Sequence, residues 1–285
     1  MRTGADRCPA TELFRPRLVV RASVRIAMRN LSTPALILSV AMSGENNRRA
    51  TVFSPDEGIF SATLYGGPKS RMRSLVSPMN SGTLYLYRDE SKNQTKITDF
   101  DVKNYHLSFR ENLFKTYAAS LATEILLKTK CAGSPQESWR ILNGFLDGME
   151  FSDENESRLG LIRFLWRYLG LLGVRPDTAL CCSCGASLHS MKITGEALSC
   201  GYVFSRAENG FVCPDCASFE KKEDFPLSKE AVTYLEAVSA LSPREARALK
   251  VSGAALSEMK RISYSLTEQA CGAKLKSLES GTGIL

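Results

Sequence analysis

The stretch "RRATVFSPDEGIFSATLYG" (residues 48–66) holds two short apolar runs on either side of Pro55-Asp56-Glu57-Gly58. Proline and glycine around polar residues are typical of a tight turn, so the stretch predicts a β-hairpin. Further strand-like runs precede and follow it at residues 34–42, 82–90 and 94–102. Five short strands with no helical pattern between them predict a small closed barrel of the OB type over residues 34–107, and an SH3-like barrel fits the same strand count.

Basic residues gather around the predicted loop at residues 66–81, which joins the third and fourth strands. The candidates for phosphate contact are Arg48, Arg49, Lys69, Arg71 and Arg73. Cations at a barrel mouth can meet successive phosphates of a nucleic acid, although an ordinary solvated loop is the simpler alternative. Three tyrosines nearby could stack on bases or simply belong to the barrel: Tyr65, Tyr85 and Tyr87.

Beyond the barrel the sequence becomes helical. Apolar residues recur at helical spacing over residues 108–130, 134–149 and 157–173. Ser108 to Glu111 fits a capping box for the first of these helices. The third helix is apolar almost all round, so it is expected at the centre of a bundle.

Arg163 and Arg167 lie one turn apart on this third helix. Their long side chains are expected to snorkel to the surface, and the alternative is that they line a groove for an acidic partner. Two segments, 108–178 and 226–277, together form the predicted helical domain, and residues 278–285 are expected to be a tail.

Cysteines cluster in "CCSCG" (residues 181–185) and "CPDC" (residues 213–216). Two Cys-x-x-Cys turns can present four sulfurs to one tetrahedral Zn²⁺, so the spacing predicts a zinc finger over residues 179–218, with paired free thiols or a redox pair as the alternatives. The expected ligands are Cys181, Cys184, Cys213 and Cys216. Strands are expected around "KITGEALSC" and "GYVFSR" (residues 192–206), and the residues left outside the coordination shell are Cys182, His189 and Cys200.

A metal held by four cysteines has no open position for water, so the predicted zinc is structural. The chain contains only two histidines, which removes most histidine-based acid–base schemes. No phosphate-binding loop, nucleophile elbow or zinc-protease motif is present in the sequence. We therefore expect neither an enzyme nor a small-molecule substrate.

The charge of this 285-residue chain, +7 overall, is unevenly distributed. Residues 1–30 contain seven arginines and two acidic residues, and residues 31–110 contain ten basic and seven acidic residues. General attraction to nucleic acid is therefore expected in this first part of the chain. Residues 1–33 are expected to be a basic extension, either a disordered arm, a transit peptide or a stretch upstream of the natural start at Met28.

Location follows from what the sequence lacks. No apolar run approaches the roughly 18 residues that a membrane span requires, and no secretory leader is apparent. Five of the nine cysteines lie in the two clusters, which favours metal binding over disulfide bridges. The chain is therefore expected in the cytoplasm, without a membrane partner.

Three features in this order resemble the RecO family of bacterial recombination mediators. They are a barrel containing "VFSPDEGIFSATLYGG" followed by "KSR", a helix ending in "LGLLGVRPD", and the two cysteine turns. The resemblance covers roughly residues 34 to 275. It implies an α+β multidomain fold, with an N-terminal OB-fold and a helical domain that carries an inserted zinc-ribbon-like finger with four cysteine ligands.

The same resemblance implies a function. Proteins of this family bind single- and double-stranded DNA, anneal complementary strands and, with RecR, help to load RecA onto strands covered by single-strand-binding protein. The basic residues of the barrel would then contact DNA without sequence preference, and the protein would associate with the nucleoid. The acidic tail of single-strand-binding protein would meet Arg163 or Arg167. The alternative is a zinc-ribbon adaptor that binds RNA or acts in transcription.

Overall fold

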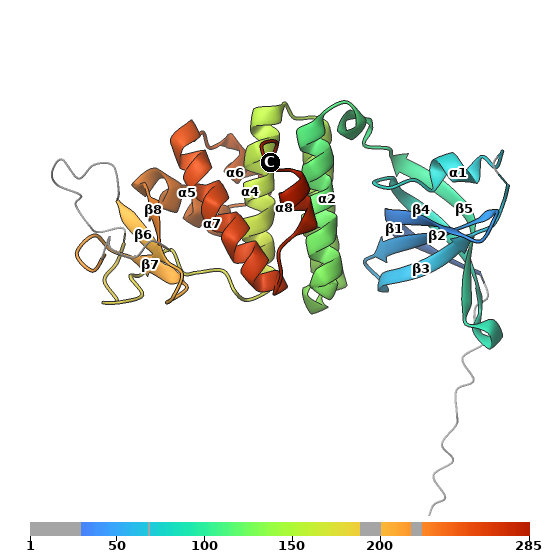
Figure 1. Ribbon diagram of the computed structural model, residues 1–285, viewed down its shortest axis with the longest axis horizontal. Helices are drawn as coiled ribbons and strands as arrows, with labels where there is room; N and C mark the ends of the chain where they lie inside the picture. The colour runs from blue at the N-terminus through green and yellow to red at the C-terminus, as the bar shows by residue number, and fades with distance from the viewer. Residues whose placement is uncertain (1–29, 68, 189–200, 218–223) are drawn as a thin grey trace, which may run out of the picture.

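The structure is a computed structural model that describes residues 30–67, 69–188, 201–217 and 224–285. It consists of three parts in a row: a β-barrel, a helical domain and a small β-sheet (Figure 1). Most of the predicted basic extension lies outside the described residues, as do His189, Cys200 and the predicted strand at 192–200.

Five strands form a closed barrel in the order β1-β2-β3-β5-β4. They are β1 (Asn30–Ser43), β2 (Asn47–Ser54), β3 (Gly58–Leu64), β4 (Ser81–Asp89) and β5 (Gln94–Asn104). The predicted turn between β2 and β3 is present, and Gly58 adopts a positive φ of 74° there, which glycine tolerates without steric cost. The barrel is OB-like, as the sequence predicts.

Alternation along the strands sorts side chains between the barrel interior and its outer face. On β4, Leu84 and Leu86 are buried in the barrel core, whereas Tyr85 is exposed. A parallel contact between β3 and β5, where Thr63 faces Lys96, closes the barrel. The predicted loop after β3 also contains one helical turn, α1 (Met72–Leu75).

Helix α4 lies at the centre of the helical domain and contacts α2, α3, α5 and α7. The helices are α2 (Leu113–Lys128), α3 (Pro135–Glu150), α4 (Glu154–Leu171), α5 (Lys229–Ala240), α6 (Pro243–Ala248), α7 (Gly253–Cys271) and α8 (Lys276–Ser280). The prediction that the third helix is central is confirmed, and it ends before Gly173, which has a φ of 73°. Its Trp166 is fully buried.

The predicted capping box at the start of α2 is wrong. Residues 107–110 form the 3₁₀ turn η2 (Leu107–Arg110), and the side chain of Asn112 instead caps α2 by accepting the Lys115 N–H at 3.0 Å. The Ser108 hydroxyl donates to the carboxylate of Glu150 on α3 at 2.7 Å. The Ser108 side chain, which the local pattern assigned to the helix cap, thus makes a tertiary contact with α3 instead.

The barrel is fixed to the helical domain through α3. Phe53 of β2 packs against Trp139 with ring centroids 5.4 Å apart. The buried imidazole of His106 lies between the two parts, with Nδ1 2.7 Å from the Met79 carbonyl oxygen and Nε2 3.0 Å from the Asp147 carboxylate. Apolar and polar contacts thus both hold the barrel against this helix.

At the other end of the molecule, β6 (Tyr202–Ser205) pairs with both β7 (Gly210–Val212) and β8 (Phe225–Leu227). Phe211 of β7 meets Trp166 of α4 edge-on, with ring centroids 6.4 Å apart. The expected tail, residues 278–285, begins within α8 and ends at the buried Leu285.

Candidate metal centre and binding surfaces

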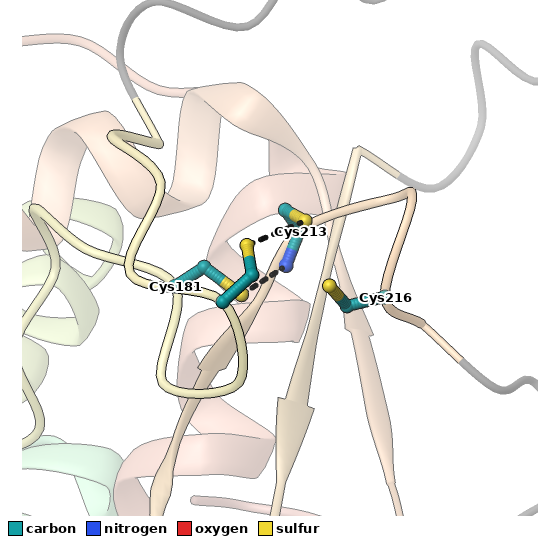
Figure 2. Close-up of side chains that lie close together, drawn as sticks. Cys181, Cys213 and Cys216 are labelled. Atoms are coloured by element: carbon teal, nitrogen blue, oxygen red, sulfur yellow. Dashed lines mark hydrogen bonds between the residues drawn. The ribbon is translucent and has the colours of Figure 1, made fainter.

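Four cysteine sulfurs meet beside the small sheet: those of Cys181, Cys184, Cys213 and Cys216. All lie within 4.8 Å of one another, and the sulfurs of Cys184 and Cys213 are 3.8 Å apart. Zn–S bonds of about 2.3 Å in a tetrahedron place sulfurs about 3.8 Å apart, so the cluster has the size of a metal site with four cysteine ligands. Figure 2 shows Cys181, Cys213 and Cys216 turned toward one another.

Two tight backbone turns present these sulfurs. Gly185 follows the first pair with a φ of 73° and donates its N–H to the Cys181 carbonyl at 2.9 Å. In the second pair, the Cys216 N–H donates to the Cys213 carbonyl at 3.1 Å. The Cys213 N–H donates to the Cys181 sulfur at 3.3 Å, which joins the two turns (Figure 2).

The thiols of the cluster differ in acidity. Burial alone would raise the pKa of Cys181, but the backbone N–H groups of Cys213, Cys184 and Ser183 outweigh it and lower this pKa to about 6. The sulfurs of Cys184 and Cys213 raise the pKa of Cys216 to about 12. A divalent cation between the sulfurs would favour the thiolate at every position, which is why such sites bind metal with release of protons.

Cys182 lies outside the cluster, where the sequence spacing also placed it. Its sulfur donates to the Glu208 carboxylate at 3.1 Å, while its N–H donates to the Phe211 carbonyl at 2.9 Å. Partial desolvation and the Glu208 carboxylate raise the pKa of this thiol to about 11. The residue therefore serves the packing of the sheet against the first cysteine turn.

The structure separates the basic residues that the sequence groups at the barrel mouth. Lys69 and Arg71 are exposed, whereas Arg73 is half-buried and donates to the carbonyls of Gly66 at 3.3 Å and Asn46 at 2.8 Å. Arg73 thereby ties the loop after β3 to the turn between β1 and β2. The guanidinium of Arg73 is therefore held in place by these two hydrogen bonds.

Neighbouring residues of a strand point to opposite sides, and this divides the pair at the start of β2. Arg48 shares the side of the buried Ala50 and Val52, at the end of the barrel interior. Arg49 lies on the opposite side and is exposed. Only Arg49 of the two is therefore placed on the outer face.

A cation that the sequence analysis missed lies on the outer face of the barrel. The ammonium of Lys96 is 5.3 Å from the ring centroid of Tyr65 and 5.9 Å from that of Tyr87. The strand alternation at 94–102 puts Lys96 on this face, but only the pairing of β5 with both β3 and β4 brings it to the tyrosines. Two aromatic rings and a cation can hold a stacked base and its phosphate together.

The helical domain contains a groove of about 470 Å³ between α3, α4 and the corner that joins α5 to α6. Five arginines and two glutamates line it, beside an apolar floor that includes Phe145 and Phe164. The charged residues are Glu137, Arg140, Glu156, Arg163, Arg167, Arg175 and Arg247. The groove therefore combines apolar surface with an excess of positive charge.

The expectation that Arg163 snorkels to the surface is wrong. The residue is 7 % exposed, and its guanidinium donates to the Tyr234 hydroxyl at 3.0 Å and to the Glu156 carboxylate. Arg167 donates to the carbonyls of Val238 at 3.3 Å and Leu241 at 3.2 Å, near the end of α5. Burial and the positive charge of the neighbouring Arg163 lower the pKa of Arg167, which means that this part of the groove disfavours positive charge.

Comparison with known proteins agrees with this architecture. Residues 28–105 match the family model "Recombination protein O N terminal", and residues 110–279 match "Recombination protein O C terminal". The two matched segments coincide with the barrel and with the helical domain together with its cysteine cluster. The fold and its two matches thus define a recombination protein.

Several curated proteins are similar over most of their length, and each is named DNA repair protein RecO. The one from Desulforamulus reducens is 25% identical over 86% of this chain and 91% of its own. That from Acetivibrio thermocellus is 24% identical over 83% of this chain and 90% of its own, and that from Caldanaerobacter subterraneus subsp. tengcongensis is 27% identical over 73% and 79%. The chain belongs to the RecO family.

Among the helices that the structure describes, none has both the length and the apolarity needed to cross a membrane.

Proposed function

We propose that this protein is a recombination mediator. It binds single- and double-stranded DNA, anneals complementary strands and, with RecR, helps to load RecA onto strands covered by single-strand-binding protein. Membership of the RecO family supports this role, and the observation that carries it to this chain is the cation of Lys96 beside Tyr65 and Tyr87 on the barrel. The proposed place of action is the nucleoid in the cytoplasm.

Annealing requires no bond chemistry from the protein. Two DNA strands repel each other through their phosphates, and cations that bind both lower this repulsion and hold the strands close enough to pair. Lys69, Arg71 and Arg49 supply exposed cations on the barrel, while Lys96 lies beside two rings on which bases can stack. Contacts of this kind read the backbone and the flat faces of bases, so no sequence preference is expected.

A salt titration of DNA binding tests the barrel surface. The double variant Lys69→Ala, Arg71→Ala should bind a single-stranded oligonucleotide more weakly and with a slope against log salt that is smaller by about 1 to 2, because about 0.7 counterions are released per phosphate contact. Lys103→Ala is the matched control, since Lys103 is exposed on the same barrel at the end of β5 near the helical domain. Equal slopes for the wild type and the double variant would remove this loop from the DNA site.

Strand annealing tests the wider function. Complementary labelled oligonucleotides coated with single-strand-binding protein should pair faster when the protein is added, first without and then with RecR, and the acceleration should fade as salt rises. No acceleration in either case would overturn the mediator role. A preference for structured RNA over single-stranded DNA in direct competition would instead support the adaptor role.

We infer that the four-cysteine cluster holds a structural Zn²⁺. The donor set, the tetrahedral spacing and the burial of Cys181 and Cys213 fit this ion. A metal bound here would cross-link the two turns. Because Cys213 directly follows β7, this cross-link would help to hold Phe211 of β7 against Trp166 of α4. Metal analysis of the purified protein tests this proposal, with about one Zn²⁺ per chain as the expected result and none as the contrary one.

The groove in the helical domain is proposed to receive the acidic tail of single-strand-binding protein. Its excess of arginines suits carboxylates, and its apolar floor suits the apolar part of a peptide. Of the two arginines first considered, Arg167 is the better candidate because its hydrogen bonds within the described part of the chain go to carbonyls, whereas the charge of Arg163 is already paired with Glu156.

The groove is tested with the tail peptide itself. Arg167→Ala should weaken binding of the peptide about three- to tenfold, since one charged contact in a partly buried site is lost. Arg261→Ala is the matched control, because Arg261 is on α7 against Phe225 and outside the groove. Wild-type affinity after Arg167→Ala would place the tail elsewhere.

A further inference from the structure

Glycines interrupt both helices that border the groove. Gly144 and Gly148 lie within α3, and Gly160 and Gly170 lie within α4. Glycine within a helix is destabilising relative to alanine, because glycine loses more backbone conformational entropy when the chain folds. Four such positions on one groove therefore call for a reason other than helix formation.

At two of the four glycines, an arginine guanidinium occupies the space that a side chain would need. A Cβ atom built on Gly148 would lie less than 3.0 Å from Nη2 of Arg247, and one on Gly170 less than 3.0 Å from Nη1 of Arg175. A Cβ on Gly144 would meet nothing within 4 Å. The bare backbone at Gly148 and Gly170 is thus what allows these two guanidiniums to lie close to the helices.

The two arginines come to the groove from different elements. Arg247 belongs to α6, keeps about half of its side-chain surface exposed, and has its Nε 3.7 Å from the Glu156 carboxylate. Arg175 follows the end of α4. Because α3 and α4 are joined by a connection of three residues, Gly148 lies near the start of α4, so the two arginines are about 20 Å apart along it.

We propose that Gly148 and Gly170 are positioning residues, which seat Arg247 and Arg175 as cations at the two ends of the groove so that it selects an extended peptide with acidic groups spread along its length. This inference rests on the proposed binding of an acidic tail. It adds a reason for two of the four glycines that border the groove: a methyl group at Gly148 or Gly170 pushes away the far end of a flexible arginine, at little cost to the fold but at a cost to the ligand's charge contact.

The test is a double-mutant cycle in the full-length protein. The probe is a fluorescent peptide with the sequence of the acidic tail, titrated at low and at moderate salt. Gly148→Ala should weaken binding about three- to fivefold at low salt, as expected for one displaced charge near the surface, and Gly170→Ala should act similarly. Arg247→Ala should weaken binding to the same extent as Gly148→Ala, and the combined variant should be no weaker than Arg247→Ala alone.

Gly144→Ala is the matched control, since it adds the same methyl group to the same helix and the same groove without meeting an arginine. It should leave affinity within about twofold of the wild type, and melting curves should show that all the alanine variants are folded. Equal losses for Gly144→Ala and Gly148→Ala, or a loss for Gly148→Ala that persists in the Arg247→Ala background, would overturn the positioning role and indicate simple filling of the groove.

If the wild type binds the peptide but Gly148→Ala and Gly170→Ala bind it equally well, the positioning role is wrong while the proposed binding of the acidic tail still stands. If the wild type does not bind the peptide, the proposed function of the groove fails and the inference fails with it.

Discussion

The barrel and the half of the molecule that contains α4 and the small sheet use polar residues in opposite ways. The barrel is held by its own apolar core, so cations such as Lys69 and Arg71 remain exposed on its surface. In the half that contains α4 and the small sheet, cysteine sulfurs and the ion pair of Arg163 with Glu156 are part of the framework. Lys69 and Arg71 are therefore available for binding because the barrel core does not need them, whereas Arg163 is used to hold the helical domain together.

Removal of the proposed Zn²⁺ should have the largest effect, and this effect should be confined to the small sheet and the two cysteine turns. Without the proposed cation, the four thiols within 4.8 Å of one another are not cross-linked, and the buried residues of the small sheet pack only as part of a core shared with α4, α5 and α7. Treatment with a strong chelator is therefore expected to cost several kcal/mol and to lower the melting temperature by about 10 °C or more. Limited proteolysis checks this: cleavage between residues 201 and 217 should become fast while the barrel stays intact.

DNA binding by the barrel gives the control for the metal experiment. The affinity for single-stranded DNA should change less than about twofold after chelation, because the barrel core contains no residue of the cluster. A parallel loss of DNA binding would break the proposed independence of the two ends.

Substitution of one arginine in the helical domain and one in the barrel should come next in size. Arg163→Ala leaves the buried hydroxyl of Tyr234 without its donor and leaves Glu156 with only the longer contact to Arg247, so it should destabilise the fold by about 2–3 kcal/mol. Arg71→Ala removes an exposed side chain and should change stability by less than about 0.5 kcal/mol. Urea midpoints for the two variants measure the difference, and coinciding midpoints would contradict it.

A smaller effect is expected from Lys96→Ala, which sharpens the comparison within the barrel. Loss of the cation beside Tyr65 and Tyr87 should weaken binding of single-stranded DNA about three- to fivefold, as expected for about 1 kcal/mol, without changing the melting temperature. Fluorescence anisotropy with an oligothymidine probe measures the loss. An unchanged affinity would confine the DNA site to the loop after β3.

The smallest predicted effect concerns the docking of α8 on α2, and it depends on pH. Burial opposes ionisation of Glu124, but the N–H groups of Ser277 and Lys276 and the nearby Lys128 outweigh it, and its pKa is lowered in the fold. A lowered pKa contributes stability above the ordinary carboxyl pKa of about 4.3, and this contribution is lost as the pH falls through the folded value. Glu124→Gln should therefore cost only about 0.5 kcal/mol at pH 7, because solvent partly screens this half-buried carboxylate, and progressively less below about pH 4. Unfolding curves at both pH values check this, and a difference that stays constant with pH would contradict it.

Local patterns predicted most of the barrel and the central helix. The strand-like run at residues 82–90 predicted a barrel strand, and the almost wholly apolar surface of residues 157–173 predicted a central helix; the structure confirms both. The same local reasoning failed at Ser108, because its hydroxyl bonds to Glu150, which lies 42 residues away in the chain. A local capping pattern contains no information about Glu150, because this residue approaches Ser108 only when the chain folds.

For the candidate sites, the sequence alone determined the residue types and the short spacings. Two Cys-x-x-Cys turns nominate four sulfurs because each turn is a local structure, and the structure brings those four together. Tertiary structure alone decided the surroundings of each cation: it put Arg163 in an ion pair, tied Arg73 to two carbonyls and brought Lys96 beside two tyrosines, one after β3 and one on β4. The physical reason is that a charge is available for binding only if groups from distant parts of the chain do not pack against it or pair with it. The spacing of residues along the sequence does not show which groups these are.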